Sequence, residues 1–208
     1  RSRSSYEERI CKFLDDIGIS YIKNCRNIIK RELDIFIESA KLAIEVNGVF
    51  WHSVNEENDN TKNKYYHWYK NKECKELGIQ LLQFTDTQID DNFDLVKSMI
   101  KSKLKLNNRI MARKCQIKEV SNKLGREFLN RNHIQKESIG GIYHGLYYDN
   151  ELVAIMQIGK SRFSKKYDYE LLRYSSLINH NVVGGFSKLL NSFDINGTFT
   201  ENALYDVK

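Results

Sequence analysis

Residues 32–52, ELDIFIESAKLAIEVNGVFWH, decide the fold of the first half of the chain. Two short apolar runs, Leu33–Ile37 and Leu42–Val46, are rich in β-branched residues and are joined by the polar connection ESAK. This pattern predicts a two-stranded hairpin. Successive side chains of a strand point to opposite faces of a sheet. Pairing of the two strands is therefore expected to bring Asp34 to Glu45.

Two interpretations of these acidic residues are open. Strand carboxylates are common, and Asp34 and Glu45 can be solvated groups on an exposed face. Alternatively, they crowd a buried sheet end together with Asn47 and His52, and such polar groups cost free energy unless they are paired or bind a metal. Carboxylate and amide oxygens suit Mg²⁺, which is usually held by one or two protein carboxylates. Mg²⁺ is therefore the expected cofactor, with Mn²⁺ as a substitute.

The spacing of Asp34, ten residues and then Glu45-Val46-Asn47 resembles the D-x(n)-E-x-K core of the PD-(D/E)XK nuclease superfamily. Asn47 stands in the place of the usual lysine. The run VNGVFWH, which ends at His52, is similar to the very-short-patch-repair (Vsr-like) endonucleases and the phage homing endonucleases related to them. The resemblance implies a metal site at Asp34, Glu45 and the Val46 carbonyl, with catalytic roles for Asn47 and His52.

The resemblance covers roughly residues 4–105. In those enzymes an N-terminal helix supplies a Glu, which implies Glu8 here, with the neighbouring Glu7 as an open alternative. The run from Tyr66 to Phe84 resembles the helix and strand after the active site, which implies catalytic roles for His67 and Lys70. In repair-type relatives an Asp near this place supports the catalytic His, and this helix has none.

The charge of the chain points to an anionic partner in its second half. The 208 residues carry a formal net charge of +6. Residues 1–106 hold 18 Lys+Arg and 17 Asp+Glu, a net charge of +1, and residues 107–208 hold 15 and 10, a net charge of +5. A basic excess favours nucleic acid, here double-stranded DNA, although it also simply keeps a protein soluble.

Cysteines and hydropathy place the chain in a reducing compartment away from membranes. Its 4 cysteines are widely spaced and form no CxxC pair, which is typical of free thiols in a cytoplasmic protein, the host cytoplasm if a phage encodes it. No apolar run approaches the ~20 residues of a membrane span, and nothing resembles a signal peptide. The chain lacks an initial Met and ends on the strand-like residues 205–208, so we expect a fragment of a longer protein.

The order of predicted elements defines an α/β (α+β) fold with two domains, 1–106 and 107–208. In the first domain a mixed sheet is flanked by helices, as in restriction-endonuclease-like folds. Its expected elements are a helix over 4–17, a short strand near 20–23, strands over 32–37, 41–47 and 79–84, and helices over 60–77 and 85–104. The basic segment Lys101–Arg113 is the expected junction, either as a solvated linker or as a segment that lies along phosphates.

The second domain is predicted to be α+β as well. Its expected elements are a strand over 115–120, a helix over 123–130, a hairpin of 141–148 and 151–158, a strand over 169–175 and a helix over 186–193. This order resembles the acyltransferase-like (GNAT) fold, and more particularly Mom-type DNA-modification domains of phage. Gly184-Gly185 at a helix start either cradles a phosphate or makes a tight turn that packs the helix closely.

The best candidates for phosphate contact in this half are basic residues interleaved with aromatic ones. They are Lys160, Arg162, Lys165 and Lys166. An ordinary solvated basic loop is the alternative.

Together these patterns predict a Mg²⁺-dependent DNA endonuclease, a hydrolase of phosphodiester bonds of the homing type from a phage or mobile element. Two alternatives stay open: an acyl- or carbamoyl-group transferase that modifies DNA through the second domain, and a DNA-binding protein with an inactive nuclease core. The recognition sequence, nicking versus double-strand cleavage and the oligomeric state are not encoded in any pattern of the chain.

Overall fold

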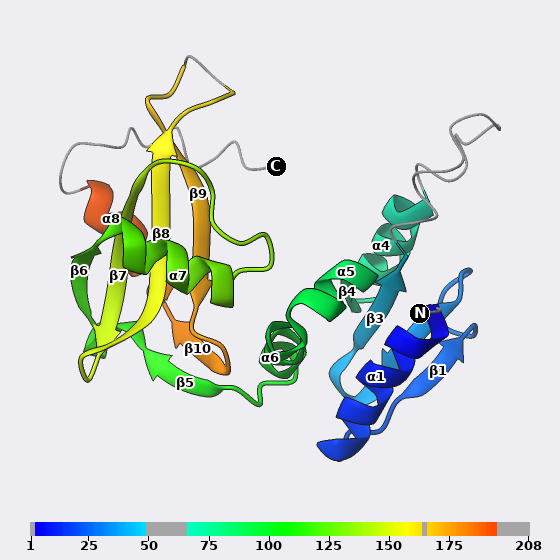
Figure 1. Cartoon of the computed structure of the whole chain (residues 1–208). Helices are drawn as coiled ribbons and strands as arrows, with labels where there is room; N and C mark the ends of the chain where they lie inside the picture. The colour runs from blue at the N-terminus through cyan, green and yellow to red at the C-terminus, as the bar shows by residue number, and fades with distance from the viewer. Residues whose placement is uncertain (1–2, 49–65, 164–165, 195–208) are drawn as a thin grey trace. The chain divides into compact units, whose positions relative to one another are not determined.

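The computed structural model describes residues 3–48, 66–163 and 166–194 (Figure 1). Contacts divide the chain into two compact units, Arg1–Leu104 and Lys105–Lys208. The division falls at Leu104, whereas the sequence placed the junction after residue 106. Among the described helices, none is long and apolar enough to cross a membrane.

The N-terminal unit is built on a mixed four-stranded sheet of order β1-β2-β3-β4. Its strands are β1 (Ile22–Cys25), β2 (Leu33–Ile37), β3 (Leu42–Asn47) and β4 (Gln80–Thr85). β1, β2 and β3 pair antiparallel, whereas β4 runs parallel to β3. The tight link between β2 and β3 is the 3-10 turn Glu38–Ala40, followed by Lys41 in the left-handed conformation. The expected mixed sheet and its hairpin are therefore confirmed.

Helices flank both faces of this sheet, and the alternation of β3 decides what each helix contacts. Helix α1 (Arg3–Asp16), together with α5 (Asp86–Asp91) and α6 (Phe93–Lys103), shares a core cluster with the Leu42, Ile44 and Val46 side. Helix α4 (Tyr66–Glu76) packs on the other face, where Cys74 meets Phe36 and Ala43. Figure 1 shows α1 and α4 on their separate sides of the strands.

Two helices replace the single helix predicted over 85–104. Thr85 and Gln88 form a reciprocal capping box that starts α5. The side chain of Asn92 then accepts a hydrogen bond from the Leu95 amide at 3.1 Å and starts α6. A second cap inside an apolar helical pattern thus explains the break.

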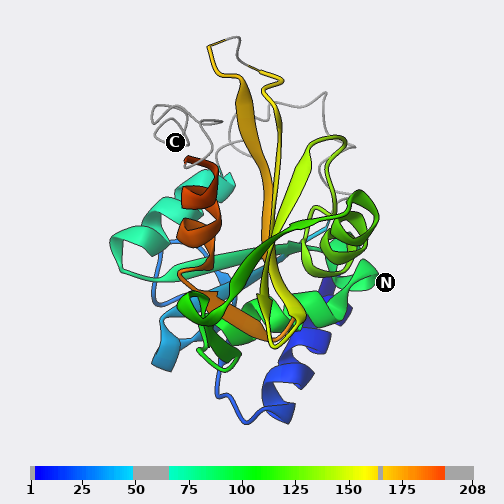
Figure 2. The ribbon, with the colours of Figure 1, turned by 90° about the vertical axis from the view of Figure 1, so that its left-hand side faces the viewer.

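The C-terminal unit is an antiparallel meander with a helix on each face (Figure 2). Its strands are β6 (Gln116–Val120), β7 (Ile142–Tyr148), β8 (Glu151–Lys160) and β9 (Tyr169–Ser176). Helix α7 (Asn122–Asn132) packs on the side of Ile155, and α8 (Gly185–Asp194) packs on the side of Met156. Asp149 and Asn150 both have positive φ, as expected for the predicted tight hairpin turn.

One segment differs from its prediction. Part of the expected junction Lys101–Arg113 forms a strand, β5 (Asn108–Met111), which pairs parallel with β10 (His180–Val183). Because β10 lies far from β5 in the sequence, no local sequence pattern predicts this pairing. The interpretation of residues 108–111 as a plain linker was wrong, whereas the division between the two units does fall within Lys101–Arg113.

Candidate active site

The acidic pair of the hairpin is buried in the sheet. Asp34 is 4% exposed and Glu45 is 3% exposed, so the interpretation of both as solvated surface groups is wrong. Ile35 pairs with Ile44 in the antiparallel register. The next pair in that register is therefore Asp34 with Glu45, on the face that α4 covers. Like charges directly opposite each other in a sheet repel. The pair therefore needs compensation from its surroundings.

Each carboxylate satisfies a backbone amide of the opposite strand. The Asp34 amide donates to Glu45 Oε1 at 3.0 Å, and the Val46 amide donates to Asp34 Oδ2 at 2.9 Å. The regular pairing of β2 and β3 ends at Ile35 and Ile44, and beyond that point these two side-chain hydrogen bonds connect the strands. The two hydrogen bonds to backbone amides fix both carboxylates in place.

Lys70 supplies the positive charge that the buried pair requires. It projects from α4, is 2% exposed, and its Nζ forms a hydrogen-bonded ion pair with Glu45 Oε2. The predicted lysine position of the strand motif is occupied by Asn47, so here the lysine comes from the following helix. The resemblance implied a role for Lys70, but the strand pattern did not predict that it binds Glu45.

The acid–base character of Glu45 reflects this crowding. Burial, and then the negative charge of Asp34, raise the pKa of Glu45, whereas the hydrogen bond and charge of Lys70 lower it. Opposed influences on a buried carboxyl are common at functional sites. The balance makes the protonation of Glu45 sensitive to any cation that joins or leaves the site.

Asn47 is placed beside the acidic pair but binds another strand. Its Nδ2 donates to Gln83 Oε1 at 3.1 Å. Gln83 lies opposite Glu45 in the parallel register of β3 and β4, so it shares the polar row of this face. Sequence reasoning missed Gln83, although its place in the predicted strand after the helix was the available signal.

The other predicted catalytic residues are placed less closely. His67 is half-buried three residues before Lys70, on the same side of α4, and its ring contacts Tyr66 edge-on at 5.6 Å. Glu8 is exposed on α1, the helix of the opposite face, so its catalytic role stays a prediction. His52 lies outside the described residues.

The described part of the site offers a hard cation two carboxylates. Asp34 and Glu45 are oxygen donors of the kind Mg²⁺ prefers, and the Val46 carbonyl and Asn47 amide stand at the same strand end. Within the described ranges no group of three or more His, Cys, Asp or Glu side chains comes together. The donor chemistry thus fits a sparsely coordinated Mg²⁺ that keeps several waters.

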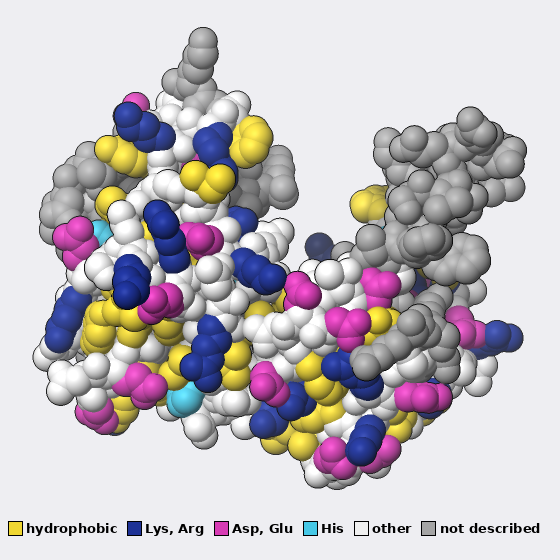
Figure 3. All heavy atoms as spheres, viewed as in Figure 1, with side chains coloured by type: hydrophobic (Ala, Val, Ile, Leu, Met, Phe, Trp, Pro, Cys, Tyr) yellow, Lys and Arg dark blue, Asp and Glu magenta, His cyan; other side chains and the backbone are white. Residues whose placement is uncertain are grey.

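The predicted DNA contacts of the second unit lie at the end of β8 and on the loop between β8 and β9. Lys160 and Lys166 are exposed, and Lys166 lies over the Tyr167 ring at 5.2 Å. Arg162 is held by Glu170 at 2.5 Å, and Phe163 beside it is 90% exposed. Lys165 lies outside the described residues. On the visible face of this unit, Lys and Arg side chains are scattered among acidic and apolar ones (Figure 3).

Packing accounts for the Gly184-Gly185 pair at the start of α8. Gly184 has a φ of +77°, a conformation that favours glycine. A Cβ on Gly185 would lie 2.6 Å from the Tyr174 hydroxyl oxygen, so only glycine fits this close approach. The tight-turn interpretation therefore explains both glycines without a bound phosphate.

No family model and no curated protein matches the chain. Among solved structures the chain is similar to the catalytic domain of the homing endonuclease I-Bth0305I. That match has 28% sequence identity, covers 47% of this chain and 91% of that one, and has a TM-score of 0.37. At that TM-score the superposition does not decide the function, which we take from the geometry of the site. The resemblances to repair endonucleases and to the acyltransferase-like fold stay predictions.

Lys70→Met should destabilise the N-terminal unit in a pH-dependent way. Loss of one partner of a buried pair costs about 3–5 kcal/mol. Without Lys70 the pKa of folded Glu45 rises further above that of the unfolded chain. The folded state then binds the extra proton, so its stability falls as pH rises through that pKa. The free energy of unfolding in urea should show the largest deficit near pH 8 and a smaller one near pH 5.

Lys12→Met is the matched control, because Lys12 is an exposed lysine of α1. It should leave the free energy of unfolding nearly unchanged at every pH. A Lys70→Met deficit that stays constant or grows toward low pH would contradict the proposed charge balance.

Proposed function

We propose that this protein is a Mg²⁺-dependent DNA endonuclease whose active site lies in the N-terminal unit. The observation that carries the proposal is the buried cluster of Asp34, Glu45 and Lys70 on one face of the sheet. The order of hairpin, helix and parallel strand further favours the homing and repair type, encoded by a phage or mobile element. The C-terminal unit would add affinity for double-stranded DNA.

Stability alone is a poor reason for such a cluster. Removing two carboxylates and an ammonium from water costs several kcal/mol per ion, and apolar residues of similar volume are often at least as stable. The neighbouring pair on the same face, Phe36 and Ala43, is apolar and buried, so this face accepts apolar side chains. A chain that keeps three charges at this point therefore keeps them for chemistry.

Each side chain has a role that follows from its place. Asp34 and Glu45 would hold the metal, with the Val46 carbonyl or Asn47 contributing directly or through water. The bound ion would polarise the scissile phosphate and stabilise the leaving oxygen. Lys70 would offset the charge that develops on the phosphate in the transition state.

We assign the proton transfers to residues for which the sequence resemblance implies a catalytic role. His52 would act as general base for the attacking water or would position it, since neutral imidazole is available near pH 7. His67, on the same side of α4 as Lys70, would assist there. Glu8 would orient water or metal from the N-terminal helix.

The ion pair between Lys70 and Glu45 weakens the case for an inactive nuclease core. That alternative rested on Asn47 in the place of the strand lysine, and the helix now provides the missing cation. The transferase alternative rested on the order of a meander, a Gly-Gly turn and a helix, and packing against Tyr174 is a sufficient reason for its Gly185. Hydrolysis of DNA is thus the function that the geometry supports best.

Asp34→Asn should abolish DNA cleavage while DNA binding persists. Asn keeps the size of the side chain and an oxygen that can accept the hydrogen bond of the Val46 amide. It removes a metal-binding charge worth several kcal/mol of transition-state stabilisation, so nicking of supercoiled plasmid with Mg²⁺ should fall at least about 100-fold. EDTA should stop the wild-type reaction.

Asp16→Asn is the matched control, because Asp16 is an exposed residue at the end of α1. It should nick plasmid at the wild-type rate. If Asp34→Asn also nicks at that rate, or if the wild-type reaction ignores EDTA, the assignment of the site is wrong.

Removing Lys160 and Lys166 together should lower the salt dependence of DNA binding. Both side chains are exposed, Lys160 at the end of β8 and Lys166 on the loop that follows it, and both are proposed to neutralise phosphates. Each phosphate contact contributes about −0.9 to the slope of log affinity against log salt, so the double alanine variant should lose about 1.8. Fluorescence anisotropy with a labelled duplex at several salt concentrations measures the slope. An unchanged slope would remove this loop from the DNA interface.

A further inference from the structure

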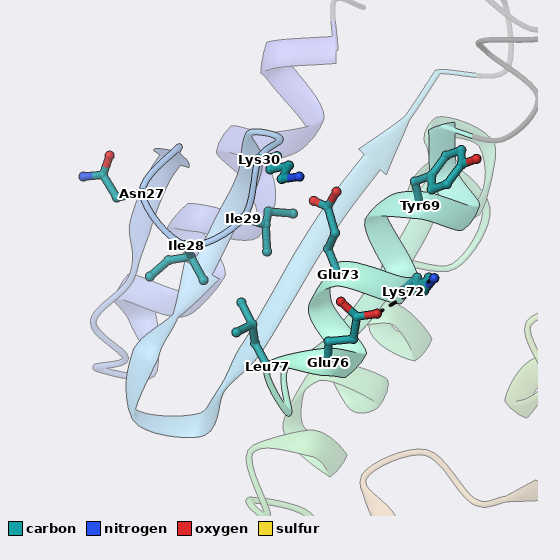
Figure 4. A pocket seen from close by; sticks show the side chains of 9 residues that line it. All are labelled: Asn27, Ile28, Ile29, Lys30, Tyr69, Lys72, Glu73, Glu76 and Leu77. Carbon is teal, nitrogen blue, oxygen red and sulfur yellow. Dashed lines mark ion pairs between the residues drawn. The ribbon is translucent and has the colours of Figure 1, made fainter.

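A pocket with a volume of about 550 Å³ lies in the N-terminal unit beside α4. One wall is the loop between β1 and β2, with Ile29 and Lys30, and the other is α4, with Tyr69 and Glu73 (Figure 4). Its volume falls within the range of small-molecule sites in proteins. None of the residues proposed for hydrolysis lines it, so it needs its own explanation.

Glu73, which lines this pocket, has a carboxylate oxygen with an unsatisfied hydrogen-bond acceptor. Its Oε1 receives an ion-paired hydrogen bond from Arg31. Its Oε2 is buried and accepts no hydrogen bond from any residue in the described ranges. A buried acceptor without a donor costs free energy. A ligand that brings an N–H group to Glu73 would recover that free energy.

The other lining groups define which kind of ligand fits. Because Arg31 already neutralises Glu73, a second cation gains little there. Lys30 and Lys72 suit a phosphate, and the Tyr69 ring and Ile29 suit a flat apolar face. An N–H donor edge, a flat ring and a phosphate together describe a nucleotide.

The pocket and the proposed cleavage site share helix α4. Glu73 and Lys70 lie on successive turns of α4, and the Arg31 guanidinium lies 5.5 Å from the Tyr66 ring centroid and 5.4 Å from that of Tyr69. The proposed cleavage site and the pocket therefore share one rigid helix. A strand held at Lys70 has its neighbouring nucleotide within reach of this wall.

We propose that the pocket binds an unstacked nucleobase of the DNA, with the exocyclic amino group of that base donating to Glu73. This inference rests on the proposed nuclease function, because it takes the ligand to be part of the substrate. Cytosine, adenine and guanine carry such an amino group, whereas thymine offers one N–H flanked by two carbonyl oxygens. Those oxygens would face a carboxylate, so thymine is disfavoured.

Access to Glu73 requires only a small adjustment. Oε2 is covered in the unliganded wall, but Lys30 is exposed and lies with Ile29 and Glu73 around the same hollow (Figure 4). Exposed side chains change rotamer within picoseconds to nanoseconds. The last torsion of Glu is broad, so the carboxylate can turn toward a donor.

The test measures nucleotide binding to the full chain in EDTA, where no hydrolysis occurs. The probes are the monophosphates of deoxycytidine, deoxyadenosine, deoxyguanosine and thymidine, titrated by NMR chemical shifts or calorimetry. The three amino-bearing nucleotides should bind at least about 5-fold more tightly than thymidine monophosphate, as expected for one satisfied buried acceptor. Oligodeoxycytidine should likewise bind more tightly than oligothymidine of equal length.

Glu73→Gln should abolish both preferences, because an amide can turn either a donor or an acceptor toward the base. Glu76→Gln is the matched control, since Glu76 lines the same pocket one turn on and only faces Lys72 at 4.0 Å. It should keep both preferences. If Glu73→Gln fails to fold, which its melting temperature would reveal, the preferences of the wild-type protein alone decide.

Equal affinity for all four nucleotides would overturn the inference, as would a preference that survives in folded Glu73→Gln. A preference seen with mononucleotides but not with oligonucleotides would overturn the assignment to a base within DNA. These outcomes are separate from those of the nuclease test. Plasmid cleavage can fail while the EDTA measurements succeed, and the reverse.

Discussion

Two buried carboxylates that face each other across neighbouring strands need a positive charge, and this constraint organises the N-terminal unit. Asp34 and Glu45 each accept a hydrogen bond from an amide of the opposite strand, which fixes both carboxylates at this end of the hairpin. Lys70 then ties α4 to this end of the sheet. This contact joins the helix to the hairpin and opposes the rise in the pKa of Glu45 that burial causes.

The same contact links structure to the proposed chemistry. A site with two anionic groups and one cation accepts a hard metal ion more readily than a neutral core does, and it keeps a lysine in place for a charged phosphate. Because α4 carries Lys70 and, one turn later, Glu73, it would align the reacting phosphate with the pocket for a neighbouring base. Catalysis and recognition would then share one rigid support.

Much of this could be predicted from sequence because it depends on local patterns. The alternation of β3 places Glu45 and Asn47 on one face, and the β-branched runs predict the hairpin around them. The partner of Glu45 could not be predicted from these patterns, since Lys70 reaches it across the fold from a helix whose polar face reads as solvated. Strand β5 was missed for the same reason: its pairing with β10 is distant in sequence.

The proposed mechanism depends on metal binding by Asp34 and Glu45. A titration of the full chain with Mn²⁺ measures this binding, either by calorimetry or by the loss of the EPR signal of the free ion. We predict that each chain binds one Mn²⁺ ion and that Mg²⁺ displaces it. Binding should tighten as pH rises, because burial and the charge of Asp34 raise the pKa of Glu45 and the ion competes with the proton for that carboxylate. Glu45→Gln should abolish that binding. Absence of bound Mn²⁺ in the wild-type protein, or undiminished binding in Glu45→Gln, would contradict the account.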